Sequence, residues 1–173
     1  MTIIISPEAS NDMEALIQHL AHEDEMGRIL RAQLHLERLL LDYICKQVER
    51  PDYIEKKNFG FAARLNIALA LGLDEELGAP LKEINLMRND FAHVQGFTIT
   101  PARVEKLEKK LSTRLKKAVT NSFKLANDSE SFGDAKNYES LKHSDKLICI
   151  VLTLWSFMMY QTNELSQQHA SKR

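Results

Sequence analysis

The chain has 173 residues, a length typical of a single domain that can bury an apolar core. Its hydrophobic content of 44% and charged content of 27% are ordinary for a globular protein. The formal net charge of −1 excludes a chain that coats nucleic acid as a polycation along its whole length. We therefore expect one domain over residues 1–173.

The cysteines and the apolar runs indicate the compartment. Cys45 and Cys149 lie far apart inside apolar helical patterns without a C-x-x-C partner, as expected for buried thiols in a reducing cytoplasm. The N-terminus lacks the basic segment of a signal peptide. The most apolar run, residues 147–160, is shorter than the roughly 20 residues that span a bilayer, so a buried helix is expected there. The sequence thus predicts a cytoplasmic protein without a membrane partner.

The N-terminal part is predicted to contain an arm and two helices. Residues 1–10 form the arm, and Asn11 or Asp12 can cap a short first helix that carries apolar residues at 16, 17 and 20. A long helix follows at about 24–49 and is stopped by Pro51. Its apolar stripe recurs at alternating spacings of four and three residues, so we expect that stripe to face the core. The stripe consists of Leu30, Leu34, Leu41, Ile44 and Val48.

Glycine and proline residues delimit the middle helices. A third helix is expected at about 59–72, where Gly72 provides a C-terminal cap. Asp74 can cap the turn that follows, and Pro80 opens a fourth helix that ends at Gly96.

The C-terminal part is predicted to contain two helices joined by a loop. After an extended link at 97–100, Thr100 caps a helix that runs to about residue 124. The polar segment 127–140 should be a mobile loop, and the last helix spans about 140–167, with a flexible tail over 166–173. That helix is apolar nearly all round, which favours a central position over one in a subunit interface. Strand-like alternation is almost absent, so the sequence predicts an all-α bundle of about five to six helices.

Three charged residues, Glu37, Arg64 and Arg88, interrupt the apolar stripes of the second, third and fourth helices. Because a buried charge is costly unless it is paired, we predict that Glu37 pairs with Arg64 or Arg88. The pair could be structural and fix the helix register. It could instead orient Arg88 toward a cleft, since a guanidinium held in one orientation suits phosphate recognition.

The segment R-N-D-F-A-H at residues 88–93 places a guanidinium, an amide and an imidazole within one and a half helical turns. On a regular helix Asn89 and His93 share a face, and Arg88 lies about 140° from His93 around the axis. On one phosphodiester, His93 would act as general acid or base, Arg88 would stabilise charge on the non-bridging oxygens, and Asn89 would orient either partner. This scheme needs no metal and no cofactor. The alternative is that His93 is a surface histidine near a helix C-terminus.

The helix predicted after Thr100 carries a basic stripe at spacings of three and four residues. Such a stripe could follow a phosphate backbone, although a solvated lysine-rich face fits equally well. The stripe consists of Arg103, Lys106, Lys110, Arg114 and Lys117. No aromatic residues are interleaved, as stacking on single strands would prefer. Elsewhere, His19, His22 and Glu23 have no further ligand within reach in the sequence, so no metal site is expected.

Two segments resemble known families. The R-N-D-F-A-H segment resembles the R-N-x-x-x-H signature of HEPN-domain proteins, which are small helical bundles. Residues 59–73, F-G-F-A-A-R-L-N-I-A-L-A-L-G-L, are similar to the G-x-(L/F)-x-x-R-(L/I)-x-L-x-x-x-L-G-(L/V) segment of the mannitol-operon-repressor family. The resemblance covers most of residues 24–165, and residues 59–93 are its most specific part.

The two families imply different functions. In HEPN ribonucleases the Arg and His of the motif are the catalytic pair, which implies these roles for Arg88 and His93, and the domains dimerise with their motifs facing one another. Mannitol repressors are regulators without a recognisable DNA-reading motif, and they often lack the intact R-x4-H that this chain keeps.

We therefore expect a mannitol-repressor-like transcription regulator that acts as a homodimer through contacts with a protein partner and with RNA or DNA. The alternative is a metal-independent endoribonuclease that uses His93 and Arg88, and a third hypothesis is a structural partner for another protein. Exposure of both residues in a cleft beside the basic stripe would favour the nuclease. Burial of Arg88 against Glu37 would favour the interaction protein.

Overall fold

The computed structural model describes residues 13, 15–17, 20, 24–93, 98–127, 132 and 135–170, without the side chains of residues 93, 125–127 and 168–170. Every regular element among them is helical, so the predicted all-α bundle is confirmed. The described positions between 13 and 20 are helical, and Leu16, Ile17 and Leu20 are buried, as expected. The predicted arm and its capping residues Asn11 and Asp12 lie outside the described residues.

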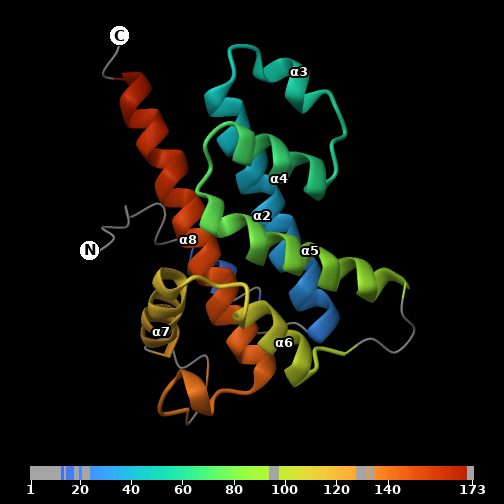
Figure 1. Ribbon diagram of the computed structural model, residues 1–173, viewed down its shortest axis with the longest axis vertical. Helices are drawn as coiled ribbons and strands as arrows, with labels where there is room; N and C mark the ends of the chain where they lie inside the picture. Colours follow the sequence, from blue (N-terminus) through green and yellow to red (C-terminus); the bar gives the residue numbers. More distant parts are fainter. Residues whose placement is uncertain are drawn as a thin grey trace.

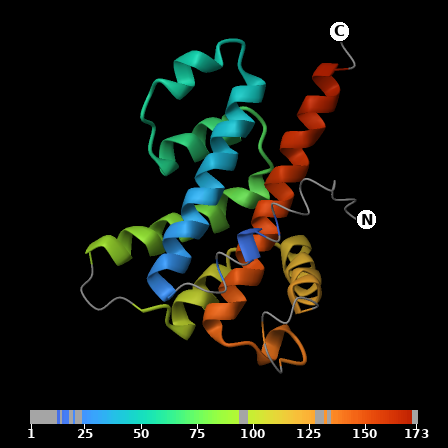
Figure 2. The same ribbon diagram turned by 180° about the vertical axis from the view of Figure 1, so that it is seen from behind.

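Two long helices, α2 (Glu25–Gln47) and α8 (His143–Ala170), lie side by side at the centre of the molecule (Figures 1 and 2). The helices α4 (Phe61–Ala70) and α5 (Gly78–His93) lie across α2. The helices α6 (Pro101–Glu108) and α7 (Thr113–Asn127) cover the N-terminal half of α8. Three short elements lie in the connections: α3 (Pro51–Glu55), η1 (Glu75–Leu77) and η2 (Tyr138–Ser140).

The last helix, α8, is the central helix that the sequence predicts, because the apolar residues in its middle leave no solvent-facing side. Residues 147–155 are all buried. The hydroxyls of Thr153, Ser156 and Thr162 donate to carbonyls four residues earlier at 2.7–2.8 Å, which satisfies polar atoms within this apolar helix. Helix α8 continues to Ala170, so residues 166–170 are helical where a tail was expected. None of the described helices combines the length and the apolar content that crossing a membrane requires.

The long helix α2 buries only the C-terminal part of the predicted stripe, where Ile44 is buried and Val48 packs against the core. Leu34, at the centre of the predicted core stripe, is 61% exposed, and Leu30 and Leu41 are half-buried. The buried apolar residues are Ile29, Ala32, Leu36, Leu39, Leu40, Tyr43 and Ile44. Leu36 lies about 160° from Leu34 around the axis at 100° per residue. Helix α2 therefore has two apolar stripes, and the one containing Leu30, Leu34 and Leu41, here called the outer leucine stripe, is not the core face.

The end of α4 is set by Gly72, as predicted. Gly72 has a φ of +100°, a left-handed conformation that glycine adopts without the steric cost of a Cβ. Its N–H donates to the Leu69 carbonyl at 3.1 Å, and the Leu73 N–H donates to the Ala68 carbonyl at 2.9 Å. This pair of bonds closes the helix end. Asp74 then caps η1 by accepting from the Glu76 N–H at 3.1 Å, so α5 begins directly after this turn.

The helix predicted between Thr100 and residue 124 is in fact two helices. Helix α6 begins at Pro101 after Thr100, as expected, but it is only eight residues long and ends at Glu108. Ser112 accounts for the break, because its Oγ accepts from the Leu115 N–H at 3.2 Å and so caps the start of α7. The same hydroxyl donates to the Glu76 carboxylate of η1, which fixes the turn between α6 and α7 against η1.

The segment 127–140, predicted to be a polar mobile loop, carries two buried aromatic residues. Phe132 stacks on Phe123 of α7 with ring centroids 6.0 Å apart. Tyr138 in η2 donates its hydroxyl to Glu108 Oε1 of α6 at 2.7 Å. These contacts attach two points of the segment to α7 and α6.

Candidate functional site

Arg88 lies on the inward side of α5, as its spacing from Ile84 predicts. Ile84 and Met87 are almost fully buried, and Arg88 itself is largely buried. Its Nη1 donates to Asn89 Oδ1 at 3.3 Å. Its Nε is buried and has no hydrogen-bond partner, and no carboxylate among the described residues forms an ion pair with it. A buried N–H without an acceptor is costly, so the position of Arg88 is not explained by a hydrogen bond to its Nε.

Glu37 pairs with Arg64, one of the two partners predicted for it. Arg64 Nη1 lies 3.5 Å from Glu37 Oε1, and the two side chains are 16% and 20% exposed. Gln33 Nε2 lies 3.5 Å from the other carboxylate oxygen of Glu37. The buried Nε of Arg64 has no hydrogen-bond partner, as with Arg88. The ion pair therefore joins α4 to α2, and within the described part of the chain Arg88 has no carboxylate partner.

His93 is the last residue of α5, and its side chain lies outside the described residues. Its backbone position is five residues after Arg88, which corresponds to about 140° around the helix axis. Asn89, four residues before His93, is engaged with Arg88. The convergence of Arg88, Asn89 and His93 on one phosphate therefore stays a prediction.

Two cations of the predicted basic stripe are engaged by carboxylates of α5. Arg103 Nη1 lies 2.6 Å from Asp90 Oδ2, and Lys106 Nζ lies 2.8 Å from Glu83 Oε1. The Glu83 side chain is only 7% exposed, so Lys106 neutralises a buried carboxylate. Arg103 and Lys106 thus hold α6 against α5.

A third stripe residue, Arg114, is engaged with η1. Its Nη1 lies 2.9 Å from Asp74 Oδ2 and 3.7 Å from Glu76 Oε1. The guanidinium also lies 4.8 Å from the centre of the Phe157 ring of α8, a cation–π contact. Arg114 therefore connects α7 to two neighbouring elements.

The single helix expected to carry the basic stripe is not present: Arg103 and Lys106 lie on α6, Lys110 lies in the turn that follows, and Arg114 and Lys117 lie on α7. Lys110 and Lys117 are exposed, and neither forms an ion pair with a described residue. Three further lysines share that property: Lys109, Lys116 and Lys124. In a single helix over this segment, these three lysines would lie outside the stripe. The face that each lysine occupies follows from the observed start of α7 at Thr113.

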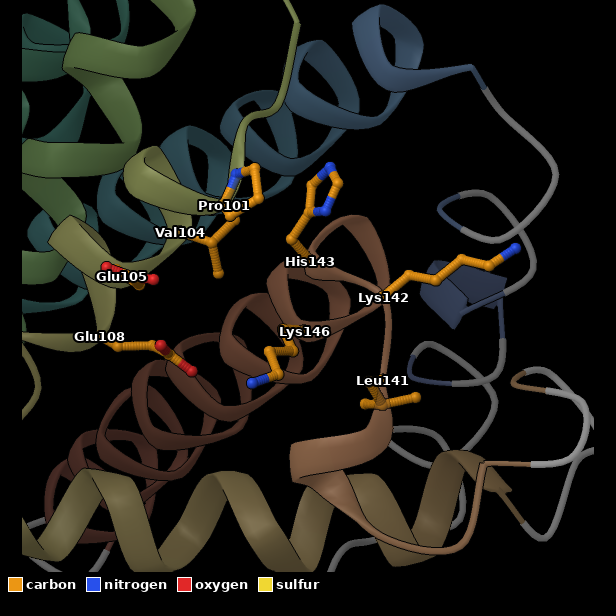
Figure 3. Close-up of a pocket in the computed structure, with 8 residues that line it drawn as sticks. All are labelled: Pro101, Val104, Glu105, Glu108, Leu141, Lys142, His143 and Lys146. Carbon is orange, nitrogen blue, oxygen red and sulfur yellow. The ribbon is translucent and has the colours of Figure 1, made fainter.

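An open groove of about 260 Å³ lies between α6 and the first turn of α8 (Figure 3). Glu105 and Glu108 line the α6 side, and His143 and Lys146 line the α8 side. Its charges are largely neutralised: Lys146 pairs with Glu139 at 3.5 Å, and the Glu108 carboxylate points toward Lys146 across the groove. None of the predicted site residues lines it, because it combines two segments that carry no motif.

The described residues offer little support for metal or thiol chemistry. Among them, no three His, Cys, Asp or Glu side chains are grouped to hold a metal ion, and His19, His22 and Glu23 lie outside them. Cys45 and Cys149 are free. Burial raises the pKa of Cys149 to about 12, and burial, with Glu55 nearby, also raises the pKa of Cys45. Neither thiol is poised to act as a nucleophile near neutral pH.

Comparisons of the chain with protein-family models, with curated proteins and with solved structures find no match. No relative therefore assigns a role to Arg88, to the outer leucine stripe or to the lysines of α7.

Proposed function

We propose that the chain is a HEPN-like, mannitol-repressor-like regulatory protein of the cytoplasm that acts through contacts with protein and nucleic acid. The observation that carries this proposal is the outer leucine stripe of α2, in which Leu34 is exposed and Leu30 and Leu41 are half-buried. Leu34 is 61% exposed, and Met26, one turn before Leu30, is 45% exposed. Large apolar side chains gathered on a surface are typical of a protein contact.

The stripe has the geometry of a helix-packing seam. Leu30, Leu34 and Leu41 lie within about 40° of one another around the axis, and the distance from Met26 to Leu41 along α2 is about 22 Å. Apolar residues at this spacing contact a partner helix in coiled coils and bundles. A second copy of the chain presents the same stripe, and most oligomers of soluble proteins are symmetric pairs of this kind. We therefore assign the stripe to a homodimer contact.

Sedimentation velocity of three proteins tests this assignment. The wild type should sediment as a dimer at ~50 µM, and Leu34→Glu should sediment as a folded monomer because a charge cannot be buried in the seam without a partner. The matched control is Tyr53→Glu, since Tyr53 is 59% exposed on α3, away from the stripe, and it should remain dimeric. If the wild type is a monomer, or if Leu34→Glu remains a dimer, the outer leucine stripe is not the homodimer contact.

Arg88 favours a second candidate function, a metal-independent endoribonuclease. Its guanidinium contacts the Asn89 amide and has no carboxylate partner among the described residues, which suits an arginine that receives a phosphate through its terminal nitrogens. In that reaction His93 would take the proton from a ribose 2′-hydroxyl, whose oxygen would bond to the phosphorus while the bond to the 5′-oxygen breaks, and the leaving 5′-oxygen would take a proton from water. Arg88 would stabilise the phosphorane oxygens. The test is RNA cleavage in EDTA, where Arg88→Lys keeps the charge but loses the planar fork and should lose most of the rate.

A further inference from the structure

One side of helix α7 is apolar, and its other side carries only neutral and basic residues. Its sequence, T-R-L-K-K-A-V-T-N-S-F-K-L-A-N, contains no Asp or Glu. Leu115, Val119 and Phe123 recur every four residues and are buried where α7 contacts α8. The side that faces solvent is therefore built from the remaining residues alone.

The outward face of α7 consists of residues three or four apart that are all exposed. They are Thr113, Lys116, Lys117, Thr120, Asn121 and Lys124. Lys109 and Lys110, in the turn before α7, are also exposed. We call the six residues on the helix the α7 lysine face. It carries three positive charges and three neutral hydrogen-bonding side chains, and it has no exposed aromatic or large apolar residue.

The charge of this face is uncompensated, in contrast to that of α6. Arg103 and Lys106 of α6 are neutralised by carboxylates of α5. Arg114, at the start of α7, is neutralised by the carboxylate of Asp74, which caps η1. Among the described residues, no carboxylate forms an ion pair with Lys116, Lys117 or Lys124. Because the whole chain has a net charge of −1, acidic residues elsewhere in the chain balance the positive charge of this face. The face itself therefore attracts anions locally.

We propose that the α7 lysine face binds the sugar–phosphate backbone of double-stranded nucleic acid, an inference that rests on the regulatory function proposed above and names its nucleic-acid surface. Lysines supply the cations and Thr and Asn supply hydrogen-bond donors, which together are common contacts to phosphate oxygens. Lys116 and Lys124 are about 12 Å apart along the helix, which matches the rise of three to four base pairs at ~3.4 Å each.

Two other polyanions fit this face less well. Single strands are bound by aromatic side chains that stack on bases, and the face has none. A helix that binds an anionic membrane inserts exposed apolar side chains between the lipids, whereas Leu115, Val119 and Phe123 of α7 are buried on its α8 side. The ligand that fits the α7 lysine face best is therefore a duplex, which the face would contact at the phosphates without recognising the base sequence.

The test is the fluorescence anisotropy of labelled 20-base-pair DNA and RNA duplexes, titrated with full-length protein between 50 and 200 mM salt. The first variant is Lys116→Gln, Lys117→Gln and Lys124→Gln together. The matched control is Lys56→Gln, Lys57→Gln and Lys136→Gln, three exposed lysines outside α7, which lowers the net charge equally. Circular dichroism and sedimentation velocity on the same samples establish that each variant is folded and has the wild-type oligomeric state.

We expect the α7 variant to bind a duplex roughly 10- to 100-fold more weakly at 50 mM salt and its salt slope to fall by about 2.7, since each phosphate contact contributes ~0.9. The control should bind like the wild type. Equal weakening in both variants, unchanged binding by the α7 variant, equal affinity for single strands, or binding to phosphatidylserine vesicles in place of duplexes would each overturn the inference. If a dimeric α7 variant still binds a duplex, the α7 lysine face is not the binding surface, and only this inference is wrong. If the folded wild-type dimer binds no duplex, the nucleic-acid part of the proposed function is wrong as well.

Discussion

Asp90 Oδ2 lies 2.6 Å from Arg103 Nη1, so a residue inside the R-N-D-F-A-H segment holds α5 against α6. Seven residues earlier on the same side of α5, Glu83 pairs with Lys106 of α6 at 2.8 Å. Two of the cations that the sequence suggested for nucleic acid therefore stabilise the fold. Of the predicted stripe, the lysines that remain exposed without an ion pair to a described residue are Lys110, in the turn before α7, and Lys117 of α7.

The pairing of Glu83 predicts that Lys106→Ala is destabilising. The substitution leaves the carboxylate of Glu83, which is 7% exposed, without its cation. A buried group that loses its partner costs about 1–3 kcal/mol, so the free energy of unfolding in urea should fall by that amount. Lys110→Ala is the matched control, because Lys110 is exposed and should change the stability by less than ~0.5 kcal/mol. Equal effects of the two substitutions would show that the contact with Glu83 contributes nothing.

Glu37→Ala should also lower stability, because it leaves the Arg64 guanidinium largely buried without a carboxylate. Since both side chains are partly exposed, we expect a loss of about 1–2 kcal/mol rather than the larger cost of a fully buried pair. Asp42→Ala, on the exposed side of α2, serves as the control. A melting temperature of Glu37→Ala that equals that of the control would mean that Glu37 is solvated.

The elements that the sequence predicts well are those with one possible orientation. Helix α8 is apolar over 147–155, so no choice of face arises. The end of α4 is predictable because glycine is the residue that accepts the φ of +100° at position 72. Local chemistry alone decides these two features.

The predictions that the structure corrects concern features that depend on contacts with elements distant in the sequence. Leu34 and Leu36 belong to two apolar stripes of α2, and the stripe that is buried depends on where α8 and α4 lie. Ser112 caps α7 locally through the Leu115 N–H, and its hydroxyl is also held by Glu76, 36 residues earlier in the chain. Likewise, the carboxylates that neutralise Arg103 and Lys106 belong to α5, and neither spacing nor propensity within the predicted helix indicates them.

Gly72→Ala should destabilise the protein through backbone strain. The nearest atom to an added Cβ would be the Tyr43 hydroxyl oxygen at 3.8 Å, an ordinary contact, so the cost comes from the φ of +100°. We expect a loss of about 1–2 kcal/mol in the free energy of unfolding. Gly72→Asn should lose less, because asparagine adopts left-handed conformations more readily. If the two substitutions have the same effect, the helix end does not depend on this conformation.

The raised pKa of Cys149, about 12, predicts low thiol reactivity and a loss of stability at alkaline pH. In the unfolded chain the thiol ionises near pH 9, whereas in the folded protein it stays protonated to about pH 12. The unfolded state therefore binds fewer protons in this window, and stability should fall as pH rises from about 9 to 12. Iodoacetamide at pH 8, followed by mass spectrometry, should leave Cys149 unmodified in the native protein and modify it in denaturant. Modification of native Cys149 at the denatured rate would contradict its burial.

The measurement that tests the proposed regulatory function most directly is cleavage of labelled, structured RNA in EDTA. The samples are the wild type, Arg88→Ala and His93→Ala, each shown to be folded by circular dichroism. A protein that acts through contacts leaves the RNA at full length in all three samples, and this is the result we predict. Cleavage by the wild type that is lost in both variants and leaves a 2′,3′-cyclic phosphate end would contradict the regulatory function and establish the ribonuclease.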